Sequence, residues 1–322
     1  MSFRRVSAGL ALATALSAAL GACTVGPDFK TPDPPATDRY LPDDGPLNLV
    51  SAGIPGGEAQ RVVSAMDIPG QWWTVFQSAP LNSLIDRSLK ANPDIAAATA
   101  GLRVAQQSAR AQRATLFPTV TGGATAAQTQ APTVMSPPTA DPNTWVYGLF
   151  TATLSIAYAP DVWGGARRAA ESAEAVAEGQ CFLLEAAYLS LASNVVAAAI
   201  TEAGLRAQVQ ATERIIASQR ETLAILRGQS TLGAVSGADV ASQEAALAQA
   251  EATLPPLNKA LAQSRNLLVT LTGELPSTAL AEKFELADLK LPPDLPLSLP
   301  SKLVEQRPDV RAAESNVHAA AA

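Results

Sequence analysis

Few residues of this 322-residue chain could carry chemistry. Its thiol and imidazole side chains are Cys23, Cys181 and His318. One histidine and two distant cysteines supply neither a disulfide framework nor a His/Cys metal cluster. The charged residues are scattered singly, without paired acids, a nucleophile elbow or a phosphate-binding loop. We therefore expect no catalytic residue, no metal and no cofactor, and rank a hydrolase last among the possible functions.

The residues before Cys23 predict a chemical role for its thiol. Residues 1–22 have the pattern of a signal peptide: two arginines begin it, and an apolar run too short to span a bilayer follows. Gly21 and Ala22 then precede Cys23, as in a bacterial lipobox. We expect Cys23 to become a diacylglycerol-modified, N-acylated terminus that anchors the chain to a membrane, where each buried methylene contributes about 0.8 kcal/mol. The alternative is a secreted protein with an incidental cysteine.

The composition favours long helices over a compact globular core. Hydrophobic residues make up 48% of the chain but aromatic residues only 5%, so alanine and leucine carry most of the apolar content. Such a composition is typical of closely packed helices and coiled coils. The net charge is −6, and no Lys/Arg run is present, which argues against a nucleic-acid partner.

The chain divides into segments at its proline-rich stretches. Residues 23–78 are rich in Pro, Gly and Asp, and we expect them to be a lipid-anchored, extended segment. Residues 79–275 are expected to form a first structural repeat. It begins with helical spacing from Leu81 and is broken at Asn92-Pro93, because a residue before proline leaves the helical region. Pro93 then suits the first turn of a second helix.

Within that repeat, residues 119–158 change to a period of two. From Trp145 on, one face carries the candidate membrane-facing side chains, Val146, Phe150, Leu154, Ile156 and Tyr158. The opposite face carries Tyr147, Thr151, Thr153 and Ser155. Both predicted strands, Thr119–Gln130 and Trp145–Tyr158, exceed the ~9–11 residues that a tilted strand needs to cross a bilayer. These residues leave two interpretations equally open, a transmembrane β-hairpin and a hairpin of a soluble domain.

Residues 165–272 predict a long antiparallel helical hairpin with its tip at 228–238. The later part of its first arm has apolar spacing of four and three residues: Leu205, Val209, Thr212, Ile216, Gln219, Leu223, Leu226. The second arm keeps a seven-residue period: Val240, Leu247, Leu254, Leu261, Leu268. This is coiled-coil spacing on both arms. Pro255 and Pro256 predict an interruption and a kink in the second arm.

The pattern of the first repeat begins again near the end of the chain. Residues 276–297 are expected to be a linker, and residues 298–322 the start of a second repeat. Arg307-Pro308-Asp309-Val310 matches Asn92-Pro93-Asp94-Ile95. The sequence stops inside the second helix of this second copy.

Together these segments predict a mainly α-helical protein with one transmembrane β-hairpin. A helix of sixty-odd residues spans about 95 Å, so two shorter helices must stack end to end beside it. Two strands cannot close a barrel, and only a closed barrel leaves no unpaired edge in lipid. If the strands are transmembrane, the protein must therefore oligomerise.

Several motifs, in the same order along nearly the whole chain, resemble those of the TolC-like outer-membrane efflux factors. They are Val25–Phe29 after the lipobox, Trp72-Trp73 with Asn92-Pro93-Asp94, Tyr158–Gly165, Gly233–Ser236 with Asp239-Val240, and Arg307–Val310. The resemblance is to the lipoproteins that serve resistance-nodulation-division pumps.

This resemblance implies a homotrimer, with an outer-membrane barrel that continues into a periplasmic helical tunnel. It implies a passive conduit that exports small molecules, and as partners a periplasmic adaptor (membrane fusion) protein and an inner-membrane resistance-nodulation-division pump. By position, Arg227, Leu232, Gly233, Val235 and Ser236 would be adaptor-docking residues. The alternative at this tip is a turn that only reverses the chain.

The sequence also departs from the family pattern, since a full-length member has a second strand pair and a second long hairpin. Three copies of this chain give six strands instead of twelve. We therefore expect an incomplete protomer, either a fragment of a longer gene product or a damaged, non-functional version. The alternative function is a structural periplasmic coiled-coil lipoprotein without channel activity.

Three other residue types have structural explanations. We expect Cys181 to be a small buried hydrophobe and His318 to have no metal role. Trp72 and Trp73 are expected to pack the N-terminal segment onto the helices, although a ligand-stacking site is the alternative.

Overall fold

A computed structural model describes residues 28–34, 36, 48–52, 57–64, 66, 68–131, 145–297 and 304–322. It divides the chain into two compact units, which are described one at a time. The first unit holds residues up to 30 together with 103–178 and 315–322. The second unit holds residues 31–102 and 179–314. The signal peptide and Cys23 lie outside the described residues.

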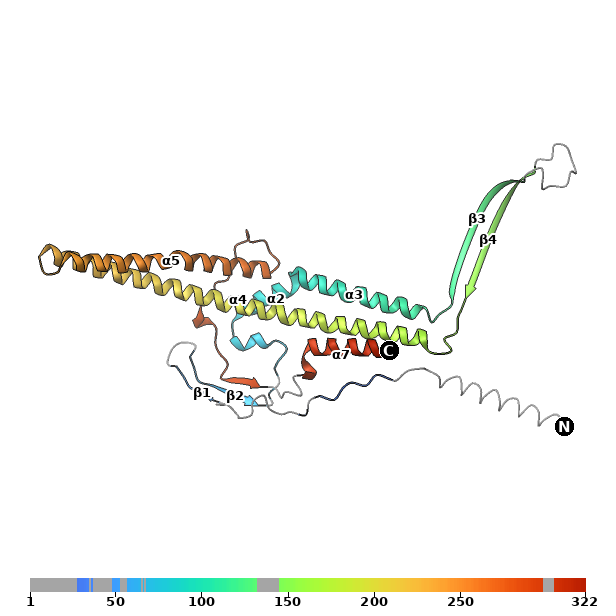
Figure 1. Cartoon of the computed structure of the whole chain (residues 1–322), viewed down its shortest axis with the longest axis horizontal. Coiled ribbons are helices and arrows are strands. Elements are labelled where there is room, and N and C mark those ends of the chain that lie inside the picture. Colours follow the sequence, from blue (N-terminus) through green and yellow to red (C-terminus); the bar gives the residue numbers. More distant parts are fainter. Residues whose placement is uncertain are drawn as a thin grey trace. The chain divides into compact units, whose positions relative to one another are not determined.

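The described chain is mainly helical, with two small sheets (Figure 1). The α-helices are α2 (Ala79–Ala91), α3 (Pro93–Ala114), α4 (Gly165–Thr231), α5 (Gly237–Leu271) and α7 (Pro308–Ala321). Two 3-10 helices, η1 and η2, cover Trp72–Phe76 and Leu286–Asp288. The strands are β1 (Asn48–Leu49), β2 (Gln60–Ser64), β3 (Thr119–Ala131), β4 (Trp145–Ala157) and β5 (Asp294–Leu297).

The two longest helices form the antiparallel pair that the heptad spacing predicts (Figure 1). Helix α4 has 67 residues, which corresponds to about 100 Å. On the arm of α4 that pairs with α5, Val209, Ile216 and Leu223 are buried at intervals of seven residues. A polar layer interrupts this apolar seam, because the Gln243 side-chain amide donates a hydrogen bond to the side-chain oxygen of Gln219. The predicted seam is therefore present on both arms.

Two predicted details of this hairpin are wrong. Helix α4 continues through Gly228 to Thr231, so the turn is shorter than the predicted tip. Helix α5 runs without a break through Pro255 and Pro256, so the prolines do not interrupt the second arm. A proline removes one backbone donor and crowds the preceding turn, but the packing of α5 along α4 outweighs this local penalty.

The hydrophobic core of the second unit gathers side chains from six segments. It includes Trp73 of η1, Leu84 of α2, Ile95 of α3, Leu268 of α5 and Phe284 next to η2. Helix α4 contributes a run of small and branched residues: Leu191, Ala192, Val195, Val196, Ala198, Ala199, Ala203. Alanines at this interface let the helix backbones approach closely. By length and composition, α4 is also long and apolar enough to cross a membrane, and 33% of its most apolar stretch is buried.

The turn between α2 and α3 lies against the end of α5. The Asn92 side-chain amide donates to the carbonyl of Leu271 at 3.0 Å, and its oxygen accepts from the Asp94 amide at 2.8 Å. Gly273 has a φ of +76°, and a Cβ there would lie 2.4 Å from the Ala91 carbonyl oxygen. Only glycine fits this site. Asn92 thus starts α3 and ties it to the end of α5, as end-to-end stacking of shorter helices requires.

A three-stranded sheet is present where the sequence predicts extended chain and a linker. Its order is β1-β2-β5, and β2 runs parallel to β5 with Arg61 opposite Asp294 and Ser64 opposite Leu297. The Arg61 guanidinium and the Asp294 carboxylate form an ion pair beside it. Within the stretch 276–297, β5 therefore binds the N-terminal segment by pairing with β2. Pairing between segments more than 200 residues apart leaves no local pattern to detect.

In the first unit, the start of α4 is flanked by the end of α3 and by α7. Arg113 of α3 lies 3.4 Å from the Glu174 carboxylate of α4. The Ser172 hydroxyl of α4 donates to the Ala319 carbonyl of α7 at 2.6 Å. Pro308 opens α7 as Pro93 opens α3, with Asp309 and Asp94 in the respective first turns. The match predicted between the two repeats therefore holds at the helix starts.

Candidate functional site

The β3–β4 hairpin is the first candidate site, because its register sorts the side chains of both strands by polarity. Thr119 pairs with Ala157 and Ala131 with Trp145, with every residue between them paired in turn. Directly opposite residues of an antiparallel pair share one face. One face therefore carries most of the apolar side chains of the two strands, together with Gln128 and Gln130: Val120, Ala124, Ala126, Val146, Phe150, Ala152, Leu154, Ile156. The other face carries the hydroxyl side chains of both strands, Thr119, Thr121, Thr125, Thr129, Thr151, Thr153 and Ser155, together with Ala127, Ala131, Trp145, Tyr147, Leu149 and Ala157.

The apolar face has no partner within the described chain. Phe150 is 84% exposed and Leu154 72% exposed. Four predicted membrane-facing residues, Val146, Phe150, Leu154 and Ile156, lie on this face. The fifth, Tyr158, follows the end of β4 and is not part of the strand. An apolar face of this size on a two-stranded sheet is unstable in water, since so small a sheet needs another layer or other strands.

Each strand of this hairpin also has one unpaired edge within the described residues. The sheet has two strands of 13 residues, so each strand presents one row of free backbone donors and acceptors along its outer side. In hydrocarbon such groups must be hydrogen-bonded, which requires strands from elsewhere. The hairpin has the form of a barrel segment.

Aromatic side chains lie exposed at the base of the hairpin. Phe117 precedes β3, and Tyr158 and Trp163 follow β4, with exposed fractions of 64%, 57% and 70%. Amphipathic aromatic rings favour the membrane–water interface. The side chains of Trp145 and Tyr147, at the other end of β4, lie outside the described residues.

The connection from β4 to α4 is fixed by Asp161. The Asp161 carboxylate accepts from the Arg167 backbone amide at 2.9 Å and from its guanidinium at 3.3 Å. Hydrogen bonds from the Arg167 backbone, and then from Ala166 and the Arg167 side chain, hold the pKa of Asp161 below its ordinary value. The carboxylate therefore satisfies free donors at the start of α4 and orients the helix at the base of the hairpin.

The turn between α4 and α5 is the second candidate site, and both of its helix ends are capped. Gly233 has a φ of 72°. Its amide donates to the Ser230 carbonyl at 3.0 Å, and the Ala234 amide donates to Gln229 at 2.9 Å, which is a Schellman motif. Ser236 and Asp239 form a capping box at the start of α5. Hydrogen bonds from the Ser236 side chain and backbone hold the pKa of Asp239 below its ordinary value.

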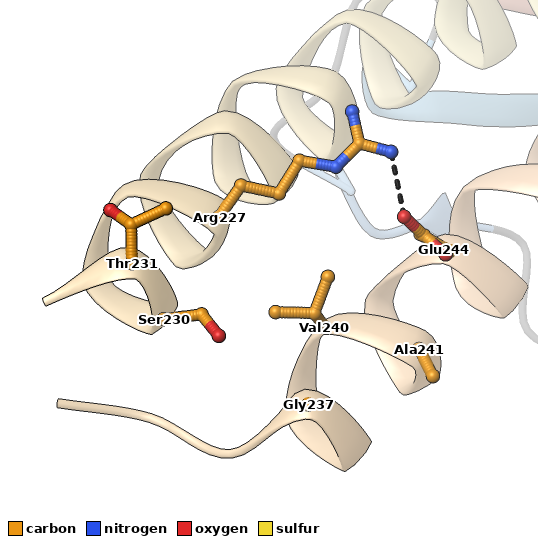
Figure 2. A pocket seen from close by; sticks show the side chains of 7 residues that line it. All are labelled: Arg227, Ser230, Thr231, Gly237, Val240, Ala241 and Glu244. Atoms are coloured by element: carbon orange, nitrogen blue, oxygen red, sulfur yellow. Dashed lines mark hydrogen bonds and ion pairs between the residues drawn. The ribbon is translucent and has the colours of Figure 1, made fainter. Parts of the chain in front are cut away.

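Beside this turn a shallow groove lies between the two helices (Figure 2). An ion pair between Arg227 and Glu244, at 2.6 Å, crosses it, and Val240 lies below the pair. Leu232 is 85% exposed at the turn. Val235, one of the predicted docking residues, is half-buried. The geometry of the turn requires Gly233 and Ser236 but gives no reason for an exposed leucine at 232.

One polar cluster is missed by the sequence analysis. The Glu202 carboxylate of α4 is fully buried and accepts from Arg206, from Arg265 of α5 at 3.0 Å and from the Phe284 amide at 3.1 Å. Arg265 also donates to the Leu280 carbonyl at 2.8 Å. The cluster fastens residues 280–284 onto both long helices. An acidic residue between Ala199 and Ala203 on the core face of α4 was the available signal.

The other reactive side chains lie apart from these sites. Cys181 is exposed on α4, so the expectation of a buried cysteine is wrong. His318 stacks on Phe29 with ring centroids 4.4 Å apart and meets the Glu171 carboxylate at 3.1 Å. Trp73 is buried in the core and Trp72 packs edge-on against it. Among the described residues, no group of three or more His, Cys, Asp or Glu side chains is arranged to hold a metal.

A long helical pair joined to an exposed β-hairpin defines the protein class as a TolC-like channel protomer, with part of the protomer represented. The family model described as "Outer membrane efflux protein" matches residues 84–274. The chain belongs to this outer membrane efflux protein family.

Individual relatives agree with this assignment. The toluene efflux pump outer membrane protein TtgC of Pseudomonas putida is 28% identical over 305 residues, which cover 94% of this chain and 59% of TtgC. The pyoverdine export outer membrane protein OpmQ of Pseudomonas aeruginosa is 30% identical over 254 residues, 78% of this chain and 53% of OpmQ. The outer-membrane channel OprN superposes with a TM-score of 0.73 at 26% identity, covering 93% of this chain and 63% of OprN. The chain thus spans less than two thirds of the length of these relatives.

Proposed function

We propose that this chain is the outer-membrane channel component of a tripartite efflux pump, a passive conduit that exports small molecules from the periplasm to the exterior. The observation that carries the proposal is the β3–β4 register, which gives one apolar face, one hydroxyl-rich face and two unpaired edges. Lipid on one side and water on the other match these faces, and neighbouring strands would satisfy the edges.

Assembly follows from the same edges. We infer a homotrimer, as the family resemblance implies, in which three copies of the hairpin contribute six strands of a barrel wall and their edges pair with neighbouring strands. The hydroxyl-rich face would then face the lumen, and Phe150 and Leu154 would face lipid. The helices α3, α4, α5 and α7 would form the periplasmic part.

The α4–α5 turn is proposed as the docking site for a periplasmic adaptor protein, which in turn connects to an inner-membrane resistance-nodulation-division pump. Leu232 supports this proposal, because an apolar side chain 85% exposed at a rigidly capped turn is suited to a partner surface. Arg227, Gly233, Val235 and Ser236 surround it. Cys23 is proposed to carry the lipid that anchors the N-terminus to the outer membrane.

The test places single cysteines on either side of the outer membrane in a Cys181→Ser background. Ser136→Cys lies in the loop between the strands, and Ser242→Cys lies on exposed α5. We expect a membrane-impermeant maleimide to label Ser136→Cys on intact cells, and to label Ser242→Cys only after the outer membrane is permeabilised. Export is measured in the same strains as the drug tolerance restored to a host that lacks its own channel.

Two results would contradict the proposal in different ways. Protection of the loop cysteine on intact cells would show that the hairpin does not cross the membrane and would favour a structural periplasmic lipoprotein. If the loop cysteine is labelled but drug tolerance is not restored, the hairpin crosses the membrane as proposed, but the chain is not an export conduit.

A further inference from the structure

Within the first unit, the N-terminal segment contacts α4 and α7 through two adjacent residues, Asp28 and Phe29. The Arg168 guanidinium of α4 lies 2.9 Å from the Asp28 carboxylate. The Phe29 ring stacks on His318 of α7, with an interplanar angle of 13°. None of the functions described above uses this contact.

The surface that receives these two residues is itself held together by Glu171 of α4. One carboxylate oxygen of Glu171 is 2.7 Å from the Arg168 guanidinium, and the other is 3.1 Å from the His318 ring. The hydrogen bond from His318, followed by that from Arg168, holds the pKa of Glu171 below its ordinary value. Arg168 is largely buried, with a side chain only 13% exposed. The receiving surface therefore has contacts of its own, between Glu171, Arg168 and His318, in addition to those with Asp28 and Phe29.

The two contacts differ in strength. The Asp28 side chain is 89% exposed, so water and salt screen its ion pair with Arg168. Phe29 is half-buried, and its ring loses apolar surface on His318 in a stacked arrangement. Phe29 must therefore supply most of the attachment, and Asp28 mainly its direction.

The position of this attachment along the chain limits where the lipid can be. Four residues lie between Cys23 and Asp28, which makes five steps along the chain, and an extended chain spans at most about 3.6 Å per step, or about 18 Å in all. Arg168 lies in the first turn of α4, whose start is bonded to Asp161. Tyr158 and Trp163, the exposed aromatic residues at the base of the hairpin, flank Asp161 in the sequence.

We propose that Asp28 and Phe29 form a latch on α4 and α7 that holds the lipid-bearing N-terminus beside the base of the β-hairpin. This rests on the proposed lipidation of Cys23. The acyl chains and the aromatic residues then enter the same membrane surface, and the latch sets how deep the hairpin sits. The protein surface formed by the latch and the base of the hairpin therefore contacts the periplasmic leaflet of the outer membrane. The acyl chains are tethered to it by a chain segment of at most about 18 Å.

The test measures the mobility of a spin label at Lys30→Cys, next to the latch, in a Cys181→Ser background and in outer-membrane vesicles. Lys30 is exposed, so the label does not displace packed side chains. A second label at Ser242→Cys on α5 reports in each variant whether the helical pair remains folded. The Cys23→Ala chain is exported behind a leader that an ordinary signal peptidase removes.

We expect the Lys30→Cys label to be immobilised in the parent chain and to remain so in Cys23→Ala, because the latch does not depend on the lipid. Phe29→Ala and His318→Ala should each raise the mobile fraction about tenfold, and Asp28→Asn by less than threefold, with the Ser242→Cys spectrum unchanged. A mobile label in the parent, or one freed by Cys23→Ala alone, would overturn the latch. Absence of acyl groups from the mass of the N-terminal peptide would instead refute the lipidation.

Discussion

At the scale of single residues, the buried carboxylate of Glu202 stabilises the fold. This carboxylate serves two arginines and one backbone amide from three segments. Glu202→Ala leaves Arg206 and Arg265 without their acceptor, and we expect a loss of about 3 kcal/mol, the lower end for a broken buried pair, because both arginines are partly exposed. Glu202→Gln should cost less, since it keeps part of the hydrogen bonding.

Chemical denaturation followed by circular dichroism measures this difference. Glu213→Ala, an exposed glutamate on the same helix, serves as the control, with an expected change within about 0.5 kcal/mol. Equal stability of Glu202→Ala and Glu213→Ala would show that the cluster contributes nothing to fastening residues 280–284.

The lowered pKa of Asp161 predicts how the stability of the protein depends on pH. The pKa of this carboxyl in the folded chain lies below the ordinary value of 3.8, so the unfolded state binds more protons at low pH. The stabilisation is present above pH 3.8 and is lost as the pH falls through the folded pKa. We therefore expect Asp161→Asn to be less stable than the parent at pH 6 and to differ less from it at pH 3. Urea midpoints at the two pH values test this, and a constant difference would contradict it.

The residues also show the limits of inference from sequence. Gly233 and Ser236 were identifiable because a left-handed residue and a capping box have local signatures. The burial of Cys181 was predicted wrongly, because the exposure of one side chain depends on which neighbours the fold brings to it. Glu202 was missed for the same reason, since its partners lie 63 and 82 residues away.

At the scale of elements, β4 offers a test of the two faces of the hairpin. Leu154→Arg places a charge on the apolar face, where an arginine facing lipid costs about 2–4 kcal/mol near the bilayer centre. Thr153→Arg, its neighbour, places the same charge on the hydroxyl-rich face. We expect Leu154→Arg to reduce the amount of protein in the outer membrane several-fold and Thr153→Arg to change it little. If both variants reduce the amount of protein in the outer membrane equally, the two faces of the hairpin do not differ in their contact with lipid.

The α4–α5 turn gives a prediction about the proposed adaptor. Leu232→Asp should leave folding unchanged, because this side chain is 85% exposed, but should weaken adaptor binding at least tenfold if it lies at the centre of the contact. Crosslinking to the adaptor in the periplasm and the thermal midpoint of the purified chain measure the two effects. The matched control is Thr231→Asp, at the exposed last residue of α4. Unchanged crosslinking in Leu232→Asp would contradict docking at this turn.

The helices and the hairpin were predictable to within a few residues because their signals are local. Seven-residue spacing marked both arms of the long pair, and alternation marked β4. The β1-β2-β5 sheet was not predictable, since β5 is a four-residue strand that contains Pro296 and pairs with a segment far back in the chain. Pro255 and Pro256 gave the wrong signal, because tertiary packing maintains α5 through them.

At the scale of the whole molecule, the two faces and the two edges of the β3–β4 sheet require different surroundings. The hairpin exposes apolar side chains and backbone groups together, which no single solvent satisfies. Lipid outside, water inside and strands from other copies satisfy all three at once. Periodicity and family resemblance predicted this arrangement from the sequence. The register of β3 with β4 adds that most of the apolar side chains of the two strands lie on the same face of the sheet.

The most direct test is the reactivity of single cysteines along β4, in a Cys181→Ser background and in reconstituted lipid. With a membrane-impermeant maleimide we expect cysteines at Thr151, Thr153 and Ser155 to react, and those at Phe150, Leu154 and Ile156 to be protected. In detergent-free urea all six should react equally. Uniform reactivity of the six positions in lipid would contradict the conclusion that the hairpin is a membrane-crossing segment of a channel wall.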